Sequence, residues 1–232
     1  QNRGETMAKS TRTPAPDMRR QILDKAAELF GKKGFEAVSV REIAEACGVS
    51  KPALYYHFEN KLDLGISIIE QLYTELGEAF DAGIAENEPE NPYELVRTII
   101  SAYLSSSRCS EGAAKFLMAE FFTGEDSAML ATIKKHDVAL SKKIIPYIHQ
   151  MEDNGALRKG SGRGLLLNLE GVLLALFIAH YRGFLRDIND DFISCVAGDI
   201  VYGFDPTCER IRQHPELENA HDKTAALWEI EL

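Results

Sequence analysis

Apolar side chains recur at helical spacing along most of the chain, and the first such stretch begins near Met18. There Ile22, Ala26, Leu29 and Phe30 fall at positions i, i+4, i+7 and i+8, which puts all four on one face. Polar residues occupy the other positions. The pattern predicts an amphipathic helix that packs one side against a core.

Polar and turn-forming residues mark the two ends of this helix. Residues 1–17 are rich in Ser, Thr, Pro, Lys and Arg, so we expect a flexible tail there, and we set residues 1–6 aside as an added or alternative start. Asp17 can cap the helix N-terminus, and Gly34 can terminate it in the left-handed conformation.

The same signals predict three further helices in quick succession. Ser39, followed three residues later by Glu42, forms a capping box that opens a second helix, and Gly48 ends it. Ser50 then caps a third, very short helix that ends near residue 58. Asn60 caps a fourth, long helix.

Helical periodicity resumes after a Pro/Glu/Asn-rich break between residues 87 and 92. No stretch alternates apolar and polar residues over several β-branched positions, so we expect no strands and an all-α fold. The polar segment 205–232 is expected to form a loop and one docked terminal helix. The further helices are predicted at about residues 92–107, 111–123, 127–153, 162–186 and 190–203.

The second and third predicted helices form a helix-turn-helix. They are short, and three to four turn residues around Gly48 join them, which is how this motif is built. Ile43, Ala44, Val49 and Leu54 can pack the two helices together, and Ala44 is small where they must cross. The motif predicts a DNA-binding domain.

The first turn of the third helix has the chemistry of a major-groove probe, because this end of a recognition helix enters the groove. Lys51 can donate to guanine O6 or N7, and the side chains of Pro52 and Ala53 can touch a thymine methyl group. Tyr55 can reach a base edge or a phosphate.

The neighbouring polar residues are suited to the phosphate backbone. Tyr56, His57 and Lys61 can donate to phosphates, Ser39 and the amides behind it offer a further phosphate site, and Arg41 can reach a base or a phosphate. The candidate DNA contacts are Ser39, Arg41, Ser50, Lys51, Pro52, Ala53, Tyr55, Tyr56, His57 and Lys61.

A three-helix segment of an ordinary all-α protein is the alternative. Short helices with glycine turns are common, and Tyr55 and Phe58 can equally be core residues that brace the first helix. Against this, a run of large rings followed by Lys61 on so short a helix is costly to place unless the side chains have something to contact.

Residues 22–61 resemble the N-terminal DNA-binding domain of the tetracycline-repressor (TetR) family. The resemblance implies repressors that act as homodimers, pair through two helices per subunit in a four-helix bundle, and release DNA when a ligand enters the helical body. It also implies DNA contacts at Arg41, Lys51, Pro52, Ala53, Tyr55, Tyr56, His57 and Lys61. The matching pattern is Ile22-Leu23-x-x-Ala26-x-x-Leu29-Phe30-x-x-x-Gly34-Phe35, then Ser39-Val40-Arg41-x-Ile43-Ala44-x-x-x-Gly48-Val49-Ser50-x-x-x-Leu54-Tyr55-x-His57-Phe58-x-x-Lys61.

The segment 165–179 is apolar almost all round, so a helix there must be covered on every side. A second copy of the chain can cover one face, and Gly171, Ala175 and Ala179, spaced by four, allow close approach. The alternative is the central helix of a monomer. The dimer-interface candidates are Gly171, Leu174, Ala175, Ile178, Val196 and Ile200.

Aromatic residues of the predicted body can line a pocket for a small-molecule effector, although each can equally be plain core. These candidates are Tyr103, Phe116, Phe121, Tyr147, Phe177 and Tyr181. We therefore divide the chain into a tail (1–17), a helix-turn-helix domain (18–64) and a helical ligand-binding and dimerisation domain (65–232).

Charge is divided unevenly along the chain. The net charge is −10, yet residues 1–61 carry +3 and residues 62–232 carry −13. A small basic module can find phosphate while an acidic body keeps the protein soluble and discourages indiscriminate binding. The charge balance is thus compatible with a double-stranded DNA operator, which a dimer would read as a palindrome.

The sequence does not favour a membrane span, a secretory signal, a metal site or a cofactor. The most apolar stretch, 165–184, is interrupted by polar residues, so no membrane span is predicted, and no secretory signal is visible. Widely spaced cysteines and scattered histidines predict reduced thiols in a cytoplasmic protein without metal or cofactor. The cysteines are Cys47, Cys109, Cys195 and Cys208.

No nucleophile elbow, P-loop, zinc-protease or dinucleotide motif is present, and Asp190-Asp191 reads as a helix start, so we expect no enzyme. The leading hypothesis is a ligand-responsive repressor. A helical enzyme and an interaction module without DNA binding remain the alternatives, and an activator is possible within the family. The sequence leaves open the effector, the operator and the regulated genes.

Overall fold

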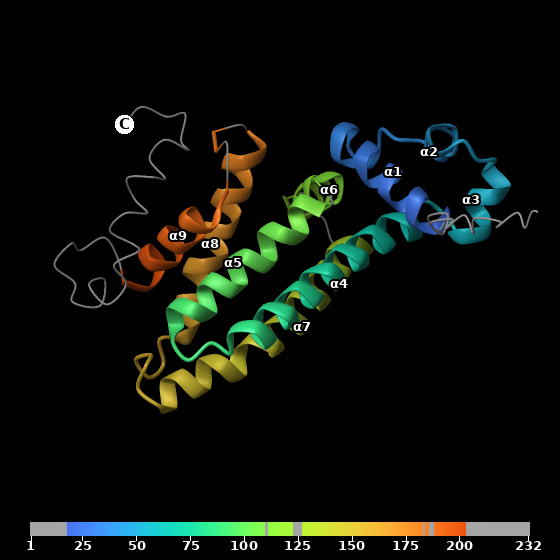
Figure 1. Cartoon of the computed structure of the whole chain (residues 1–232). Coiled ribbons are helices and arrows are strands. Elements are labelled where there is room, and N and C mark those ends of the chain that lie inside the picture. Colours follow the sequence, from blue (N-terminus) through green and yellow to red (C-terminus); the bar gives the residue numbers. More distant parts are fainter. Residues whose placement is uncertain (1–17, 110, 123–126, 183, 186–187, 203–232) are drawn as a thin grey trace, which may run out of the picture.

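The computed structural model describes residues 18–109, 111–122, 127–182, 184–185 and 188–202. These residues confirm the all-α fold class. Long helices run side by side through the body, and α1 to α3 form a head at one end of it (Figure 1). The helices are α1 (Met18–Lys33), α2 (Val40–Cys47), α3 (Lys51–His57), α4 (Lys61–Asn87), α5 (Pro92–Cys109), α6 (Glu111–Phe122), α7 (Ala128–Asp153), α8 (Gly162–Tyr181) and α9 (Asp190–Tyr202).

The helix boundaries agree with the sequence-based predictions except at the end of α8. This helix ends at Tyr181 rather than near residue 186. The backbone amides of Phe184 and Leu185 both donate to the carbonyl of Ala179, at 2.9 and 3.2 Å, so the chain folds back over the helix end. The predicted tail, the Asp17 cap and the segment 205–232 lie outside the described residues.

Local capping explains where the helices of the head begin. The Ser39 hydroxyl accepts from the amide of Glu42 at 3.2 Å, and the Ser50 hydroxyl accepts from that of Ala53 at 3.3 Å. Gly48 ends α2 with φ +67°, a left-handed conformation that favours glycine. The capping box is half correct, because the Glu42 carboxylate accepts from Lys33 on α1.

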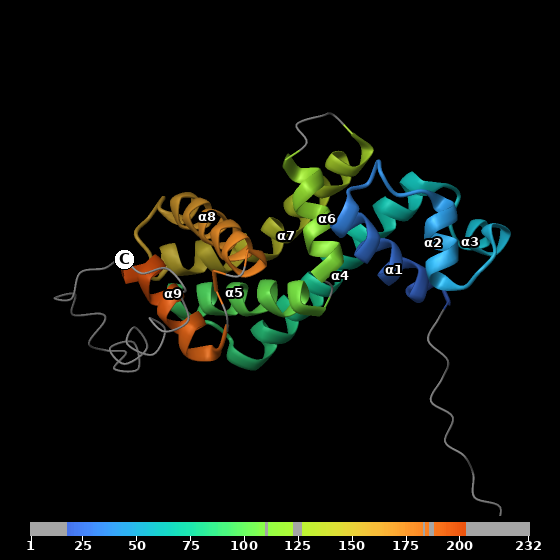
Figure 2. The same cartoon turned by 90° about the horizontal axis from the view of Figure 1, so that it is seen from above.

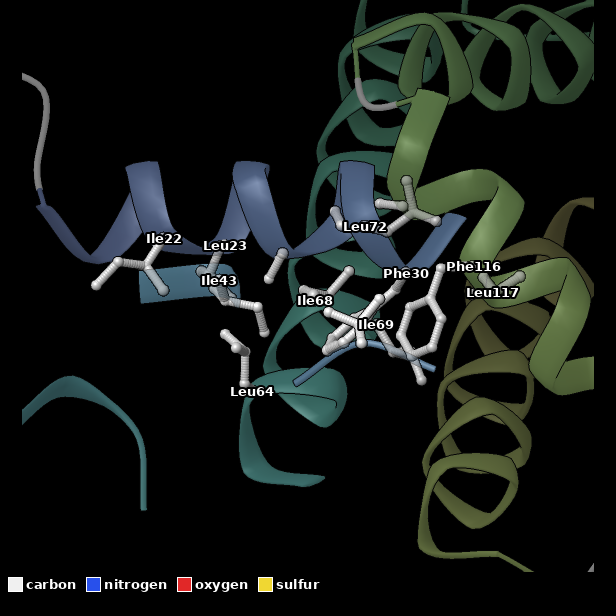
Figure 3. Close-up of a cluster of buried hydrophobic side chains, with 14 of the residues drawn as sticks. Ile22, Leu23, Phe30, Ile43, Leu64, Ile68, Ile69, Leu72, Phe116 and Leu117 are labelled. Atoms are coloured by element: carbon white, nitrogen blue, oxygen red, sulfur yellow. The ribbon is translucent and has the colours of Figure 1, made fainter. Parts of the chain in front are cut away.

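The core of the head continues into the body. Side chains of α1 to α4 pack with residues of α6, and Phe30 and Phe116 lie 5.1 Å apart between ring centroids (Figure 3). Helix α4 also runs unbroken past residue 64, where the domain boundary was predicted. The helix-turn-helix is therefore joined to the body by a rigid helix and a shared core rather than by a linker.

Two glycines bring the backbones of α1 and α6 together. A Cβ built on Gly112 would lie 2.7 Å from backbone atoms of Glu28, and one built on Gly31 would lie 2.5 Å from the Gly112 carbonyl oxygen. Helix α6 stands beside α1 and leads from there into the body (Figure 2). No larger residue fits this crossing without moving one of the two helices.

Candidate functional site

Buried anchors hold α3 on the head. Leu54 is fully buried, Phe58 is nearly so, and the guanidinium of Arg19 lies 5.0 Å from the centroid of the Phe58 ring. The amide of Val49 donates to the carbonyl of Ala44 at 3.0 Å, which closes the turn between α2 and α3. These contacts make the two helices one rigid unit, and they place Phe58 in the core.

The opposite face of α3 carries side chains that are exposed to solvent. Tyr56 is 85% exposed and Tyr55 is 49% exposed, while Lys51 and Pro52 also lie on the surface. The Tyr56 ring meets the His57 ring edge to face at a centroid distance of 5.1 Å. Large exposed side chains of this kind contribute little to folding and are available for contact with another molecule.

Ser39, Ser50 and Arg41 have partners within the head. Both hydroxyls cap their own helices, as described above. The guanidinium of Arg41 is paired with Glu45, with 2.7 Å between Nε and Oε1, on a solvent-exposed part of α2. An exposed pair of this kind is worth little, so a phosphate can replace the Glu45 carboxylate at small cost.

Ala53 and His57 lie half-buried on the same short helix. The His57 ring is held between its neighbours, with its centroid 5.1 Å from that of Tyr56 and 6.4 Å from that of Phe58. Its position at the last turn of α3 leaves it beside the exposed Tyr56 rather than in the core.

Lys61 lies differently from our expectation. Its ammonium donates to the carbonyls of Phe35 and Val38, at 2.8 and 3.2 Å, and lies 4.3 Å from the centroid of the Phe35 ring. These groups belong to the connection between α1 and α2. Because the charge already has several partners, we assign Lys61 to holding this connection and leave it out of the DNA interface.

A second candidate site is a cavity of about 460 Å³ in the body. It lies among α4, α5, α6, α7 and α8, and its wall is mostly apolar. This volume is in the range of sites for drug-sized molecules. The lining residues are Leu72, Tyr73, Leu76, Ile99, Tyr103, Ser106, Ala114, Leu117, Met118, Phe121, Asp137, Leu140, Ser141, Ile144, Leu166, Leu167, Leu169, Glu170, Gly171, Leu173, Leu174 and Phe177.

The structure separates the six aromatic candidates into two groups. Tyr103, Phe121 and Phe177 line the cavity. The other three do not line it: Phe116 is fully buried in the core of the head, Tyr147 packs against Phe80, and Tyr181 packs against Phe177 with its ring tilted and lies under Lys115. Sequence periodicity places residues on an inner face but does not say whether a neighbour fills the space in front of them.

The polar end of the cavity was missed by the sequence analysis. The Tyr73 hydroxyl donates to the carboxylate of Asp137, and the Tyr73 ring stacks on His136 at a centroid distance of 5.1 Å. Burial raises the pKa of Tyr73, and it raises the pKa of Tyr103 to about 12, so both phenols keep their protons at neutral pH. Nothing in the local pattern marks Asp137, which lies among the charged residues of α7.

The predicted dimer surface lies on α8 and α9. Ile178 is 46% exposed, Ala175 and Gly171 are exposed, and Val196 and Ile200 are half-buried against a core of the body that includes Phe192 and Leu176. Gly171 and Leu174 also line the cavity, a role that the sequence analysis did not assign to them. One side of α8 therefore borders the cavity, while apolar side chains elsewhere on it are not covered by the described part of the chain.

Helix α8 meets the length and hydropathy of a membrane span, with a mean hydropathy of 1.6. Only 28% of that window is buried within the chain. Core helices of soluble proteins pass the same test, so length and composition alone do not indicate a membrane. In the part of the chain that the structure describes, no three His, Cys, Asp or Glu side chains gather where they could hold a metal ion.

The head matches known regulators in sequence. A family model described as "Bacterial regulatory proteins, tetR family" matches residues 22–67, which are α1, α2, α3 and the start of α4. The regulator AcrR of Shigella flexneri is 35% identical over 105 residues, covering 45% of this chain and 48% of AcrR. Residues 22–67 therefore match the DNA-binding domain of the TetR family.

Solved structures share the fold over about four fifths of this chain. PfmR from Thermus thermophilus superposes with a TM-score of 0.66 at 22% identity, covering 82% of this chain and 99% of PfmR. AibR, solved in complex with isovaleryl coenzyme A and operator DNA, superposes with a TM-score of 0.62 at 22% identity, covering 81% and 99%. The match to AcrR spans about half the length of AcrR.

Proposed function

We propose that this protein is a ligand-responsive transcriptional repressor of the TetR family that acts in the cytoplasm. A homodimer binds a palindromic operator through α2 and α3, and an effector in the cavity releases it. One observation carries the proposal: α3 is anchored by Leu54 and Phe58 and turns Lys51 and Tyr56 to solvent, with the adjacent His57 as the one ring contact of Tyr56 among the described residues. A helical enzyme, or an interaction module without DNA binding, would not need these exposed side chains on α3.

The candidate contacts have the chemistry of groove and phosphate recognition. Lys51, Pro52 and Ala53 stand at the leading turn of α3, the end that reads base edges. Tyr55 and Tyr56 follow them along α3, and Arg41 adds a candidate contact on α2. In a dimer, the two copies of these candidate contacts should meet half-sites about one helical turn, or a multiple of it, apart.

Effector and operator sites are connected through α4 and α6. Leu72 and Leu117 line the cavity and also belong to the buried core of the head. A ligand that moves α6 therefore pushes on α1 at the Gly31–Gly112 crossing. We propose that the effector prefers the arrangement in which the two recognition helices fit the operator poorly, which is how a ligand shifts such an equilibrium.

A gel shift with DNA from upstream of the protein's own gene tests the proposal. At low salt and without ligand, we expect retardation with the stoichiometry of a dimer, and a steep loss of binding as salt is raised. A specific competitor should remove the shift while unrelated DNA should not. If neither this DNA nor any other genomic fragment is retarded, the proposed function is wrong.

The proposed dimer gives a separate prediction at α8. Replacing Ile178 by glutamate places a charge on the apolar surface that we propose for pairing, so we expect a folded monomer of 25.8 kDa instead of a dimer, and loss of the gel shift. Light scattering coupled to size exclusion measures the mass. Val138→Glu, at an equally exposed apolar site on α7, is the control and should remain dimeric. A dimer that survives Ile178→Glu places the interface elsewhere.

A further inference from the structure

Among the described residues that line it, the cavity has negatively charged side chains and no positively charged ones. Its lining includes the carboxylates of Asp137 and Glu170, and none of the lining residues is lysine, arginine or histidine. We infer that the effector is a lipophilic cation, whose positive group lies beside Asp137 while its apolar body fills the rest of the cavity. The inference rests on the proposed function, since it treats this cavity as the effector site.

Asp137 is held in place to receive a cation. It accepts a hydrogen bond from the hydroxyl of Tyr73, whose ring is fixed by stacking on His136. Burial raises the pKa of Asp137, against the opposing effects of the Tyr73 hydrogen bond and of His136. Asp137 itself is exposed to solvent while Tyr73 beside it is half-buried, so a cation in the cavity would meet a carboxylate that one phenol holds in place.

Aromatic rings surround the same space. Tyr73, Tyr103, Phe121 and Phe177 all line the cavity. Ring faces attract a cation whose charge is spread over an apolar surface, and they also bury its hydrocarbon part. A volume of about 460 Å³ accommodates a drug-sized molecule rather than a metal ion or a small ammonium ion.

An anionic effector fits the wall less well. A fatty acid or an acyl thioester of a nucleotide would bring negative charge to a lining that already holds two carboxylates. Two lysines of the body are engaged elsewhere, because Lys143 is paired with Asp81 and Lys115 lies over the Tyr181 ring and pairs with Glu111. None of these groups belongs to the lining.

Two probes of the same shape and opposite charge test the inference. Tetraphenylphosphonium and tetraphenylborate are titrated calorimetrically into the full chain without DNA. We expect the phosphonium to bind at least about tenfold more tightly, as a charge contact in a partly buried site would give. Asp137→Asn should weaken phosphonium binding by about tenfold. Asp153→Asn, on the same helix but outside the cavity, is the matched control and should change nothing.

The outcomes separate this inference from the proposed function. If the borate binds as tightly as the phosphonium, or if Asp137→Asn leaves phosphonium affinity unchanged, the effector is not a cation held by Asp137. Should Asp137→Asn fail to fold, Tyr73→Phe keeps the carboxylate without its phenol partner, and it must preserve the preference for the phosphonium. A missing gel shift would refute DNA binding but would leave the charge preference measured in these titrations intact.

Discussion

Tyr56→Ala is expected to reduce operator affinity by about 10- to 100-fold and to leave the melting temperature unchanged. The side chain is 85% exposed on α3, and its one ring contact among the described residues is with the adjacent His57. Its removal therefore opens no cavity in the core. All of the effect should fall on the contact that the ring makes with DNA.

Fluorescence anisotropy with a labelled operator measures this loss, and repeating it at several salt concentrations shows which kind of contact is lost. If Tyr56 contacts a phosphate, binding should weaken about equally on operator and unrelated DNA. Lys51→Ala should instead relax discrimination at one base pair if the ammonium reads guanine, or lower the salt slope by about one if it contacts a phosphate.

Lys142→Ala provides the control for lost positive charge, because Lys142 is exposed on α7 in the body. It should leave operator affinity within about twofold of the original value, since surface changes away from an interface usually have small effects. Unchanged affinity in Tyr56→Ala and Lys51→Ala together would remove α3 from the interface, whatever the gel shift shows for the original protein.

Gly112→Ala is expected to lower the free energy of unfolding by about 3 kcal/mol, and with it the melting temperature by about 6–12 °C. The added methyl group would meet backbone atoms of Glu28 at 2.7 Å, and backbone cannot move aside as a flexible side chain can. Relief requires α1 and α6 to separate. Their separation would also disturb the shared core around Phe30 and Phe116.

Thermal unfolding followed by circular dichroism, at one protein concentration, measures this difference. Gly164→Ala is the matched control, because a Cβ at that helical position on α8 meets nothing within 4 Å. It should be neutral or stabilising by about 0.5–1 kcal/mol, as alanine restricts the unfolded chain. Equal melting temperatures for Gly112→Ala and Gly164→Ala would mean that α1 and α6 do not meet backbone to backbone.

Gly112→Ala also tests the proposed connection between cavity and operator. If the crossing transmits the effector's action, the variant protein at a temperature where it is folded should bind the operator more weakly even without ligand. Unchanged operator affinity in the folded variant would instead indicate that α4 carries the signal alone. Stability and operator affinity are compared in the same preparation, so that a loss of binding is not confused with a loss of folded protein.

The sequence by itself determined the helices of the head and their ends. Ser39, Ser50 and Gly48 act within four residues of their own positions, through caps and a left-handed turn, so a local pattern contains all the information needed. Helical periodicity likewise put Leu54 in the core. The exposed row on α3 follows, because the residues left over on a short helix must face outward.

Only the tertiary structure decided what distant residues do. Lys61 was expected to face DNA, but its partners are carbonyls 23 to 26 residues earlier in the chain, which no local pattern reveals. Phe116 and Phe121 lie on the same helix and look alike in sequence, yet one fills the core and the other lines the cavity. A cavity is the space that several helices leave unfilled, so its existence, and the role of Asp137 in it, depends on how those helices pack together.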